Sequence, residues 1–288
     1  MTVHSKHRKF FRFLSGACRC SCLPTLNHFR LANRCLDPAD TPFSELEQQA
    51  WQGIDPENWW DCHTHIVGSG DGGSGIVLNA AMQQPLRHPI QTLLYKAYAN
   101  AACTGEPGGQ DNAFVERLVA LMDTMPTGAK AMLFAFDKVY DPDGRPDNRR
   151  TSFYVPNDYA RLLAARFPKR FEWVASIHPY RKDCVALLEQ CHAQGARAIK
   201  WLPSSMGIDP ADARCDRFYL KAAALNLPII SHGGEEKSVH GANQQALSNP
   251  LRLKRALDAG VRMVVAHCAT LGDEIDDQGR AARNFDLF

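Results

Sequence analysis

The segment Trp59-Trp60-Asp61-Cys62-His63-Thr64-His65-Ile66-Val67 decides the expected fold. It is a short, mostly apolar run interrupted by two histidines. Side chains alternate between the two faces of a β-strand, so His63 and His65 are predicted to point to the same side. Two imidazoles on one side can bind a single cation. A lone His-x-His pair is weak evidence for a metal site. Further residues in the rest of the chain are needed to support it.

Five further apolar runs of strand length follow the first one. Each is rich in Val, Ile, Ala or aromatic residues, as expected for strands that are buried on both faces. They span residues 129–136, 171–177, 196–199, 227–230 and 261–266.

Helical segments lie before and between these runs. Apolar spacing, capping residues and C-terminal glycines predict them. They span residues 42–53, 112–125, 157–167, 183–194, 212–226 and 249–259. Strands that alternate with helices indicate a parallel sheet with right-handed crossovers.

The spacing of the strands favours an α/β fold of the TIM type, a (β/α) barrel. His63 and His267 are 204 residues apart, which gives intervals of about 41 residues, a normal βα spacing for this barrel. We expect residues 1–54 to be an N-terminal extension, partly disordered with a short helix, and residues 55–288 to be the barrel. About six of eight βα units are present, so the barrel is expected to be incomplete.

An open doubly wound sheet would give the same rhythm of strands and helices. Such a sheet would usually carry a glycine-rich phosphate turn after its first strand. Residues 68–73 are glycine-rich but lead into no obvious helix start. We therefore interpret this segment as a flexible active-site loop.

Polar side chains end the last three apolar runs: Lys200, His232 after Ser231, and His267. In barrels of this type, the C-terminal ends of the strands line the catalytic face. The sequence therefore predicts that these three side chains share one cup with His63 and His65. Neutral imidazole is the commonest protein ligand for zinc and similar ions.

Composition argues against several classes of partner. The chain has 288 residues, 45% of them hydrophobic, and a formal net charge of +2. No block of like charge indicates nucleic-acid binding, and no window approaches the roughly 18 apolar residues of a membrane span. Arg12 interrupts the apolar stretch that a secretory signal would need. We expect a cytoplasmic protein with a small-molecule substrate, and a homo-oligomer is left open.

Ten cysteines are present, four of them early: Cys18, Cys20, Cys22 and Cys35. A disulfide framework is typical of short secreted chains, and zinc sites usually show Cys-x2–4-Cys pairs. Neither pattern fits well. We therefore expect these cysteines to be free thiols in a reducing compartment.

At this point a family resemblance is specific. Asp61-x-His63-x-His65 resembles the opening motif of the amidohydrolase superfamily, in its amidohydrolase-related branch. Ser231-His232-Gly233 and Ala266-His267-Cys268 are similar to its strand-five and strand-six histidines. The segments around His178 and Lys200 resemble its third and fourth strands. The resemblance covers roughly residues 55–288.

The resemblance implies a role for each residue of the predicted cup. His63, His65 and His232 would bind a divalent metal, most plausibly zinc. His267 would bind a second metal or assist the attacking water. Lys200 would be carbamylated and bridge two metals, or would be structural or contact substrate with one metal. A bound ion would act as a Lewis acid and lower the pKa of water toward ~7.

The resemblance also implies a catalytic aspartate after an eighth strand, and no residue among 270–288 stands at such a position. The acidic residues nearby are interpreted as solvated loop charges. They are Asp273, Glu274, Asp276 and Asp277.

Other polar residues are secondary candidates. His178 and Trp201 are predicted to contact substrate, although core packing explains Trp201 equally well. Asp137 is a further candidate at a strand end, and the loop after residue 232 offers Glu235, Glu236 and His240.

The predicted function is a metal-dependent hydrolase that acts on a C–N or C–O bond of a small carbonyl substrate. Nonoxidative decarboxylation on the same scaffold is the alternative chemistry. A catalytically inactive, truncated barrel is the alternative of a different class.

Overall fold

The computed structural model describes residue 35 and residues 44–104, 109–236, 239 and 244–288. Six parallel strands form two three-stranded sheets in the orders β1-β3-β5 and β6-β7-β8. A bridge between Ala175 and Ile199 links the two sheets. The strands are β1 (Trp60–His65), β3 (Lys130–Phe134), β5 (Phe171–Val174), β6 (Ile199–Trp201), β7 (Ile229–His232) and β8 (Met263–Ala266). All six predicted strands are confirmed within a few residues.

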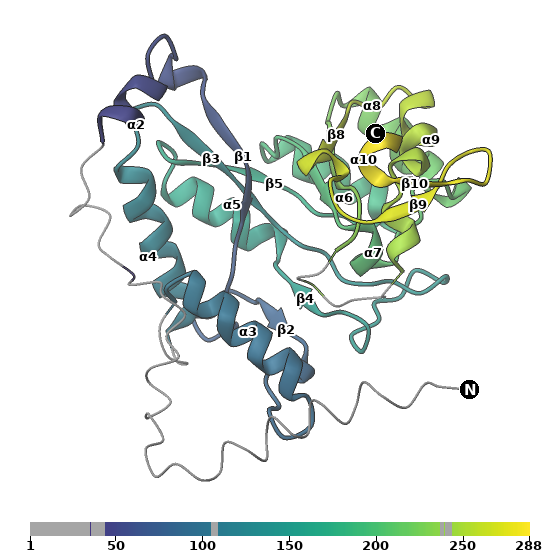
Figure 1. The fold of residues 1–288 in the computed structure, drawn as a ribbon, viewed down its shortest axis with the longest axis horizontal. Coiled ribbons are helices and arrows are strands. Elements are labelled where there is room, and N and C mark those ends of the chain that lie inside the picture. Colours follow the sequence, from purple (N-terminus) through teal and green to yellow (C-terminus); the bar gives the residue numbers. More distant parts are fainter. Residues whose placement is uncertain (1–34, 36–43, 105–108, 237–238, 240–243) are drawn as a thin grey trace, which may run out of the picture. The chain divides into compact units, whose positions relative to one another are not determined.

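Helices alternate with these strands, as predicted (Figure 1). The α-helices are α2 (Glu45–Ala50), α3 (Pro89–Ala101), α4 (Gln110–Asp123), α5 (Asn157–Arg166), α6 (Cys184–Ala193), α7 (Pro203–Met206), α8 (Asp216–Ala224), α9 (Lys254–Asp258) and α10 (Asn284–Leu287). The 3-10 helices are η4 (Pro56–Asn58), η5 (Ala80–Met82), η6 (Ala213–Cys215), η7 (Gln245–Ser248), η8 (Pro250–Leu253) and η9 (His267–Ala269). Helix α3 was not predicted from the sequence.

Ser44 caps the N-terminus of α2. Ser44 Oγ accepts a hydrogen bond from the backbone N–H of Glu47, whose carboxylate accepts one from the N–H of Ser44. This reciprocal pair is a capping box.

Two small antiparallel pairs were also not predicted. The strands β2 (Val77–Leu78) and β4 (Phe153–Tyr154) pair with each other. The strands β9 (Asp273–Ile275) and β10 (Ala281–Arg283) pair within the acidic segment near residue 276. Asp276 accepts hydrogen bonds from the backbone of Gln278 and Arg280, so one of the predicted loop charges shapes a turn.

The parallel strands carry apolar side chains on both faces. The face covered by helices forms the larger core, with Leu133, Trp173 and Ile229 among its buried members. The opposite face, which we call the inner face, holds a second cluster. It consists of Met132, Phe134, Val174, Ala198 and Ile230, with Trp60 packed against them. Because side chains alternate, Lys200 and His232 lie on this inner face as well.

A charged group lies at the N-terminal end of the inner face. Lys130 and Arg197 bind the Glu172 carboxylate at 2.7 and 2.9 Å, and both cations lie over the Trp60 ring. Burial alone would raise the pKa of Glu172, but these two hydrogen bonds outweigh burial and lower it. The polar groups at this end are therefore paired with one another.

A bulge in β1 sets the direction of the two histidines. Trp60 pairs with Lys130 and Asp61 with Ala131, whereas Thr64 pairs with Leu133, which leaves one extra residue in β1. A bulge of one residue reverses the alternation that follows it. As a result, Trp60 below the bulge and His65 above it both face inward.

The described residues do not form a closed barrel, and no strand among them pairs with the outer edge of β1 or of β8. In the same part of the chain, no helix combines the length and the apolar character needed to cross a membrane.

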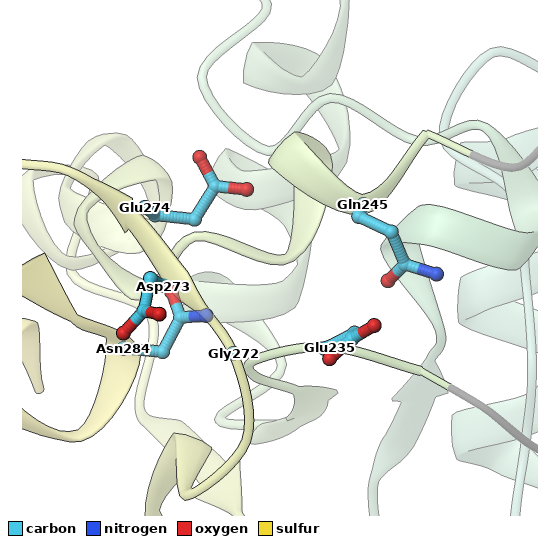
Figure 2. A pocket seen from close by; sticks show the side chains of 6 residues that line it. All are labelled: Glu235, Gln245, Gly272, Asp273, Glu274 and Asn284. Atoms are coloured by element: carbon cyan, nitrogen blue, oxygen red, sulfur yellow. The ribbon is translucent and has the colours of Figure 1, made fainter. Parts of the chain in front are cut away.

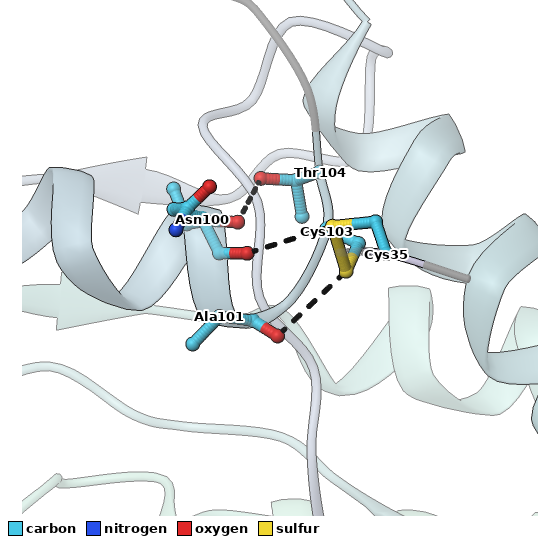
Figure 3. The surroundings of a disulfide bond; sticks show 6 residues. Cys35, Asn100, Ala101, Cys103 and Thr104 are labelled. Atoms are coloured by element: carbon cyan, nitrogen blue, oxygen red, sulfur yellow. Dashed lines mark hydrogen bonds between the residues drawn. A yellow bond between two sulfur atoms is a disulfide. The ribbon is translucent and has the colours of Figure 1, made fainter. Parts of the chain in front are cut away.

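The structure corrects one expectation about the cysteines. Cys35 forms a disulfide with Cys103, which lies just beyond the end of α3, and the two Cα atoms are 5.6 Å apart (Figure 3). The expectation of a free thiol at Cys35 is therefore wrong. A Cα separation of this size suits a disulfide, and no spacing in the sequence identifies the partner of Cys35. Cys18, Cys20 and Cys22 lie outside the described residues.

Candidate metal centre

His63 and His65 form the first of two histidine pairs. Their Nε2 atoms are 3.2 Å apart, which confirms that both rings point to one side of β1. The two rings lie over Phe134, at centroid distances of 5.2 and 5.4 Å. Phe134 therefore forms the floor of the site beneath this pair.

His232 and His267 form the second pair. His232 ends β7 and His267 follows β8, and His267 Nε2 lies 3.1 Å from His232 Nδ1. The ring of His267 also lies 5.9 Å from that of His63. The two pairs therefore border one site, as the sequence analysis predicted.

Lys200 lies close to the four histidines, because its charge lowers the pKa of each of them. Its side chain is 1% exposed, and Nζ has no hydrogen-bond partner among the described residues. Nζ lies 5.1 Å from the centroid of the Phe134 ring. Burial lowers the pKa of this amine to about 7, since removal from water disfavours its charged form.

All four histidines are held in their neutral form. Burial is the largest cause and lowers the pKa of His232 to about 3. Burial and the positive charge of Lys200 also lower the pKa of His63, His65 and His267. Burial lowers the pKa of His65 to about 3 as well.

These residues fit a divalent metal in their chemistry. Neutral imidazole is the form that binds metals. Two nitrogens bound to one tetrahedral zinc at ~2.0–2.1 Å lie about 3.4 Å apart, close to the 3.2 Å between the Nε2 atoms of His63 and His65. His232 Nε2 is also buried and has no hydrogen-bond partner among the described residues. Within this described part, no three His, Cys, Asp or Glu side chains are already drawn together around one point.

A strained turn places His267. The residues His267, Cys268 and Ala269 all have positive φ, of 42°, 51° and 49°. L-residues rarely adopt this conformation, and three in succession are rarer still. The turn packs on the backbone after β7, where a Cβ on Gly233 would come within 3.1 Å of the Cβ of Ala269. Glycine at 233 therefore lets the His267 turn approach His232.

His178 and Trp201, which are predicted to contact substrate, are both buried and hydrogen-bonded within the protein. His178 is 0% exposed; its Nε2 donates to the carbonyl of Met206, and its Nδ1 accepts from the N–H of Tyr180. Trp201 is also fully buried and donates to the carbonyl of Ile177. Trp201 follows Lys200 directly, so strand alternation turns it to the helix-covered face.

The structure also corrects the expectation of a flexible loop after β1. The Asp111 carboxylate, at the start of α4, accepts hydrogen bonds from the backbone of Ser69, Gly70 and Gly72 and from the hydroxyl of Ser74. In return, Asp71 accepts from two N–H groups of the first turn of α4. This loop is therefore held at several points.

Two residues of the candidate site, Phe134 and Glu236, have contacts that were not predicted from the sequence. Phe134 was treated only as part of a strand, although its alternation with Met132 already places it on the inner face. Glu236 was a secondary candidate, and its Oε2 lies 3.4 Å from Nδ1 of His232. His240 lies outside the described residues.

A cavity of about 310 Å³ adjoins this region (Figure 2). Carboxylates and side-chain amides provide most of its lining. The lining residues are Glu235, Gln245, Gly272, Asp273, Glu274 and Asn284. Two of the lining residues, Glu235 and Gly272, come three residues after His232 and five residues after His267. The cavity therefore lies beside the loops that follow the second histidine pair.

Comparison with known proteins identifies the family. Residues 60–282 match the amidohydrolase family. The chain belongs to this family. It is thus an α/β protein of the TIM type, and the predicted resemblance is confirmed.

No curated protein matches this amidohydrolase significantly. It is similar to an uncharacterized TIM-barrel protein, Bb4693, from Bordetella bronchiseptica, with 15% identity over 72% of this chain and 66% of that one, and a TM-score of 0.47. A probable 2-pyrone-4,6-dicarboxylic acid hydrolase from Acinetobacter baumannii is 14% identical over 62% of this chain and 50% of its own, with a TM-score of 0.36.

A 5-carboxyvanillate decarboxylase from Novosphingobium aromaticivorans, with bound manganese, is 14% identical over 74% of this chain and 67% of its own, with a TM-score of 0.43. The chain thus spans between half and two thirds of the length of these three proteins.

Proposed function

We propose that this amidohydrolase is a metal-dependent hydrolase that acts on a C–N or C–O bond of a small carbonyl substrate. The observation that carries the proposal is that two pairs of neutral histidines border one site, with the buried Lys200 against the same Phe134 ring as His63 and His65. Family membership supports the same reading, because amidohydrolases are generally metal-dependent.

His63, His65 and His232 are the residues proposed to hold the ion, most plausibly zinc. A bound ion would supply Lewis acidity, polarising a carbonyl oxygen and lowering the pKa of water toward ~7. His267, at the exposed rim of the site, would then hold a proton or orient the attacking water through a ring nitrogen.

Two alternative roles are proposed for Lys200. A buried amine without a hydrogen-bond partner is unfavourable, so a group that satisfies Nζ stabilises the site. With one ion, a carboxylate of the substrate is the group that fits. With two ions, carbamylated Lys200 would bridge them, and His267 would bind the second.

Decarboxylation is the second candidate reaction at this site. The observation that favours it is again Lys200, because a substrate carboxylate placed against this buried amine would lie close to the four histidines.

Metal content tests the proposal directly. Purified protein is expected to contain about one tightly bound divalent ion per chain, or about two if Lys200 is carbamylated, measured by elemental analysis. The double variant His63→Ala with His65→Ala should lose the metal and any activity. Wild-type protein without tightly bound metal, or a double variant with unchanged activity, contradicts the proposal.

The number of ions decides the role of Lys200. Lys200→Ala should release one of two ions from a binuclear site and should leave a mononuclear site loaded. A stoichiometry near one in the wild-type protein rules out the binuclear reading. Assays of carboxylated esters, lactones and amides with detection of both acid and CO₂ release then separate hydrolysis from decarboxylation.

A further inference from the structure

The two ring nitrogens of His232 have different surroundings. Nδ1 faces two groups, namely His267 Nε2 at 3.1 Å and the Glu236 carboxylate at 3.4 Å. Nε2 is buried and has no hydrogen-bond partner among the described residues. The contacts of this ring with His267 and Glu236 therefore both lie on Nδ1, and the backbone of Gly234 and Glu235 also lies near the ring.

Glu236 is held firmly in place beside this ring. Its backbone N–H donates to Gln245 Oε1 at 2.8 Å, and its carbonyl accepts from Gln245 Nε2 at 2.8 Å. Its Oε1 accepts a hydrogen bond from the N–H of Val239 at 3.0 Å. These three bonds leave Oε2 facing His232.

The position of the carboxylate has a chemical consequence for the imidazole. An ionised carboxylate only accepts hydrogen bonds, so Glu236 favours a proton on Nδ1 of His232. A neutral ring that carries its proton on Nδ1 has its lone pair on Nε2. His267 Nε2 faces the same nitrogen and can share that proton as an acceptor.

Burial strengthens the effect of this carboxylate. The side chains of His232 and Glu236 are only 8% and 9% exposed. Electrostatic interactions are stronger in such poorly hydrated surroundings than in water. A proton on Nε2 would instead leave a buried donor without a partner, which is costly.

We propose that Glu236 is a positioning residue, which holds His232 as the Nδ1–H tautomer so that Nε2 presents its lone pair to a divalent cation. The second half of this statement rests on the proposed function. Carboxylates that orient metal-binding histidines in this manner typically contribute 10–100-fold to metal affinity.

Glu236→Gln is the decisive variant, because it keeps the shape of the side chain. The Gln oxygen can still accept from Val239, and its NH₂ group then faces His232 and donates to Nδ1. This arrangement should move the imidazole proton to Nε2. Glu235→Gln is the matched control, since it removes the neighbouring carboxylate of the same loop, which lines the cavity in Figure 2.

The tautomer is measured in metal-free protein by NMR of ¹⁵N-labelled histidine, with His232→Gln to assign the signals. Wild-type protein and Glu235→Gln should show Nδ1–H at His232, and Glu236→Gln should show Nε2–H. Equilibrium dialysis with Zn²⁺, and with Co²⁺ as a spectroscopic probe, should show a 10–100-fold weaker affinity for Glu236→Gln only. Glu236→Ala is the second variant in case Glu236→Gln does not fold.

Two results overturn the inference. One is Nε2–H at His232 in the wild-type protein, and the other is a Glu236 variant that keeps both the tautomer and the Zn²⁺ affinity of the wild type. Failure of the proposed function looks different. A wild-type protein that binds no metal, but whose His232 tautomer still depends on Glu236, contradicts metal binding and supports the positioning of His232 by Glu236.

Discussion

Lys200 lies against the face of Phe134, with its Nζ 5.1 Å from the ring centroid and without a hydrogen-bond partner among the described residues. The aromatic ring offers this buried amine a favourable electrostatic contact, although a weaker one than a carboxylate would offer. The same ring supports His63 and His65 from below. One side chain of β3 therefore contacts three candidate residues from two other strands.

Truncation of Phe134 should disrupt both the core and the site. Phe134→Ala is expected to lower the free energy of unfolding by about 3–5 kcal/mol, because it opens a cavity on the inner face. Phe134→Leu keeps most of the apolar volume and should lower it by only about 1 kcal/mol. Urea denaturation measures both values. A Phe134→Ala protein as stable as the wild type would place Phe134 outside the core.

The strained turn at His267 predicts that two substitutions change the free energy of unfolding in opposite directions. Ala269→Gly should raise the free energy of unfolding by roughly 0.5–1 kcal/mol, because glycine adopts positive φ without steric strain. Gly234→Ala should lower it, because Gly234 has φ of 83° and an added Cβ would lie 2.6 Å from the carbonyl oxygen of Leu271. Thermal or urea unfolding measures the sign of both changes in the free energy of unfolding. If both variants shift it equally in the same direction, the result would argue against a left-handed turn.

Asp111 should contribute more to the free energy of unfolding than Asp123, an exposed aspartate of the same helix. Asp111→Asn weakens four hydrogen bonds to the loop after β1 and should lower the free energy of unfolding by at least about 2 kcal/mol, since each bond to a charged group contributes roughly 1.5–3 kcal/mol. Asp123→Asn breaks only a partly exposed ion pair with Arg170 and should cost less than about 1 kcal/mol. Chemical denaturation of the two variants compares them, and similar values would contradict a tightly held loop.

Acid should destabilise the protein through its buried histidines. Burial lowers the pKa of His178 to about 3, although its hydrogen bond to Met206 opposes the shift. The unfolded chain takes up a proton near the ordinary value of ~6.5, whereas the folded chain does not. Stability is therefore fully present above that value and falls as the pH drops toward 3, by up to about 1.4 kcal/mol per unit for each such group.

Urea titrations at several pH values between 7 and 4 test this dependence. His178→Gln should flatten the slope over this range, even if it lowers stability at pH 7. His192→Gln, at an exposed position of α6, should leave the slope unchanged. An unchanged slope in His178→Gln would show that this histidine is protonated in the folded protein or ionises equally in both states.

The sequence was sufficient for those features that depend on local periodicity. Six apolar runs predicted the six parallel strands, and polar residues at their ends predicted the gathering of His63, His232 and Lys200. The direction of Trp201 was also predictable, because it follows the inward Lys200 and must face the helices. The prediction of substrate contact neglected this alternation.

Other features depend on contacts that the sequence does not reveal. The bulge in β1 arises from its register with β3, and the disulfide from the proximity of Cys35 to the end of α3. Asp111 lies about forty residues from the glycines that it holds, and the spacing gives no sign of the contact. Glu236 was visible in the sequence, but only the bonds that orient it distinguish it from Glu235.

The Cys35–Cys103 disulfide has a consequence for limited proteolysis. The bond closes a covalent ring of 68 residue steps, which contains all of β1 with both of its histidines. A protease that cuts once inside this ring leaves two pieces that stay joined through sulfur and migrate as one band until a reductant is added. Fragment maps of this protein made under reducing and non-reducing conditions should therefore differ, and the difference locates every cut between residues 36 and 102.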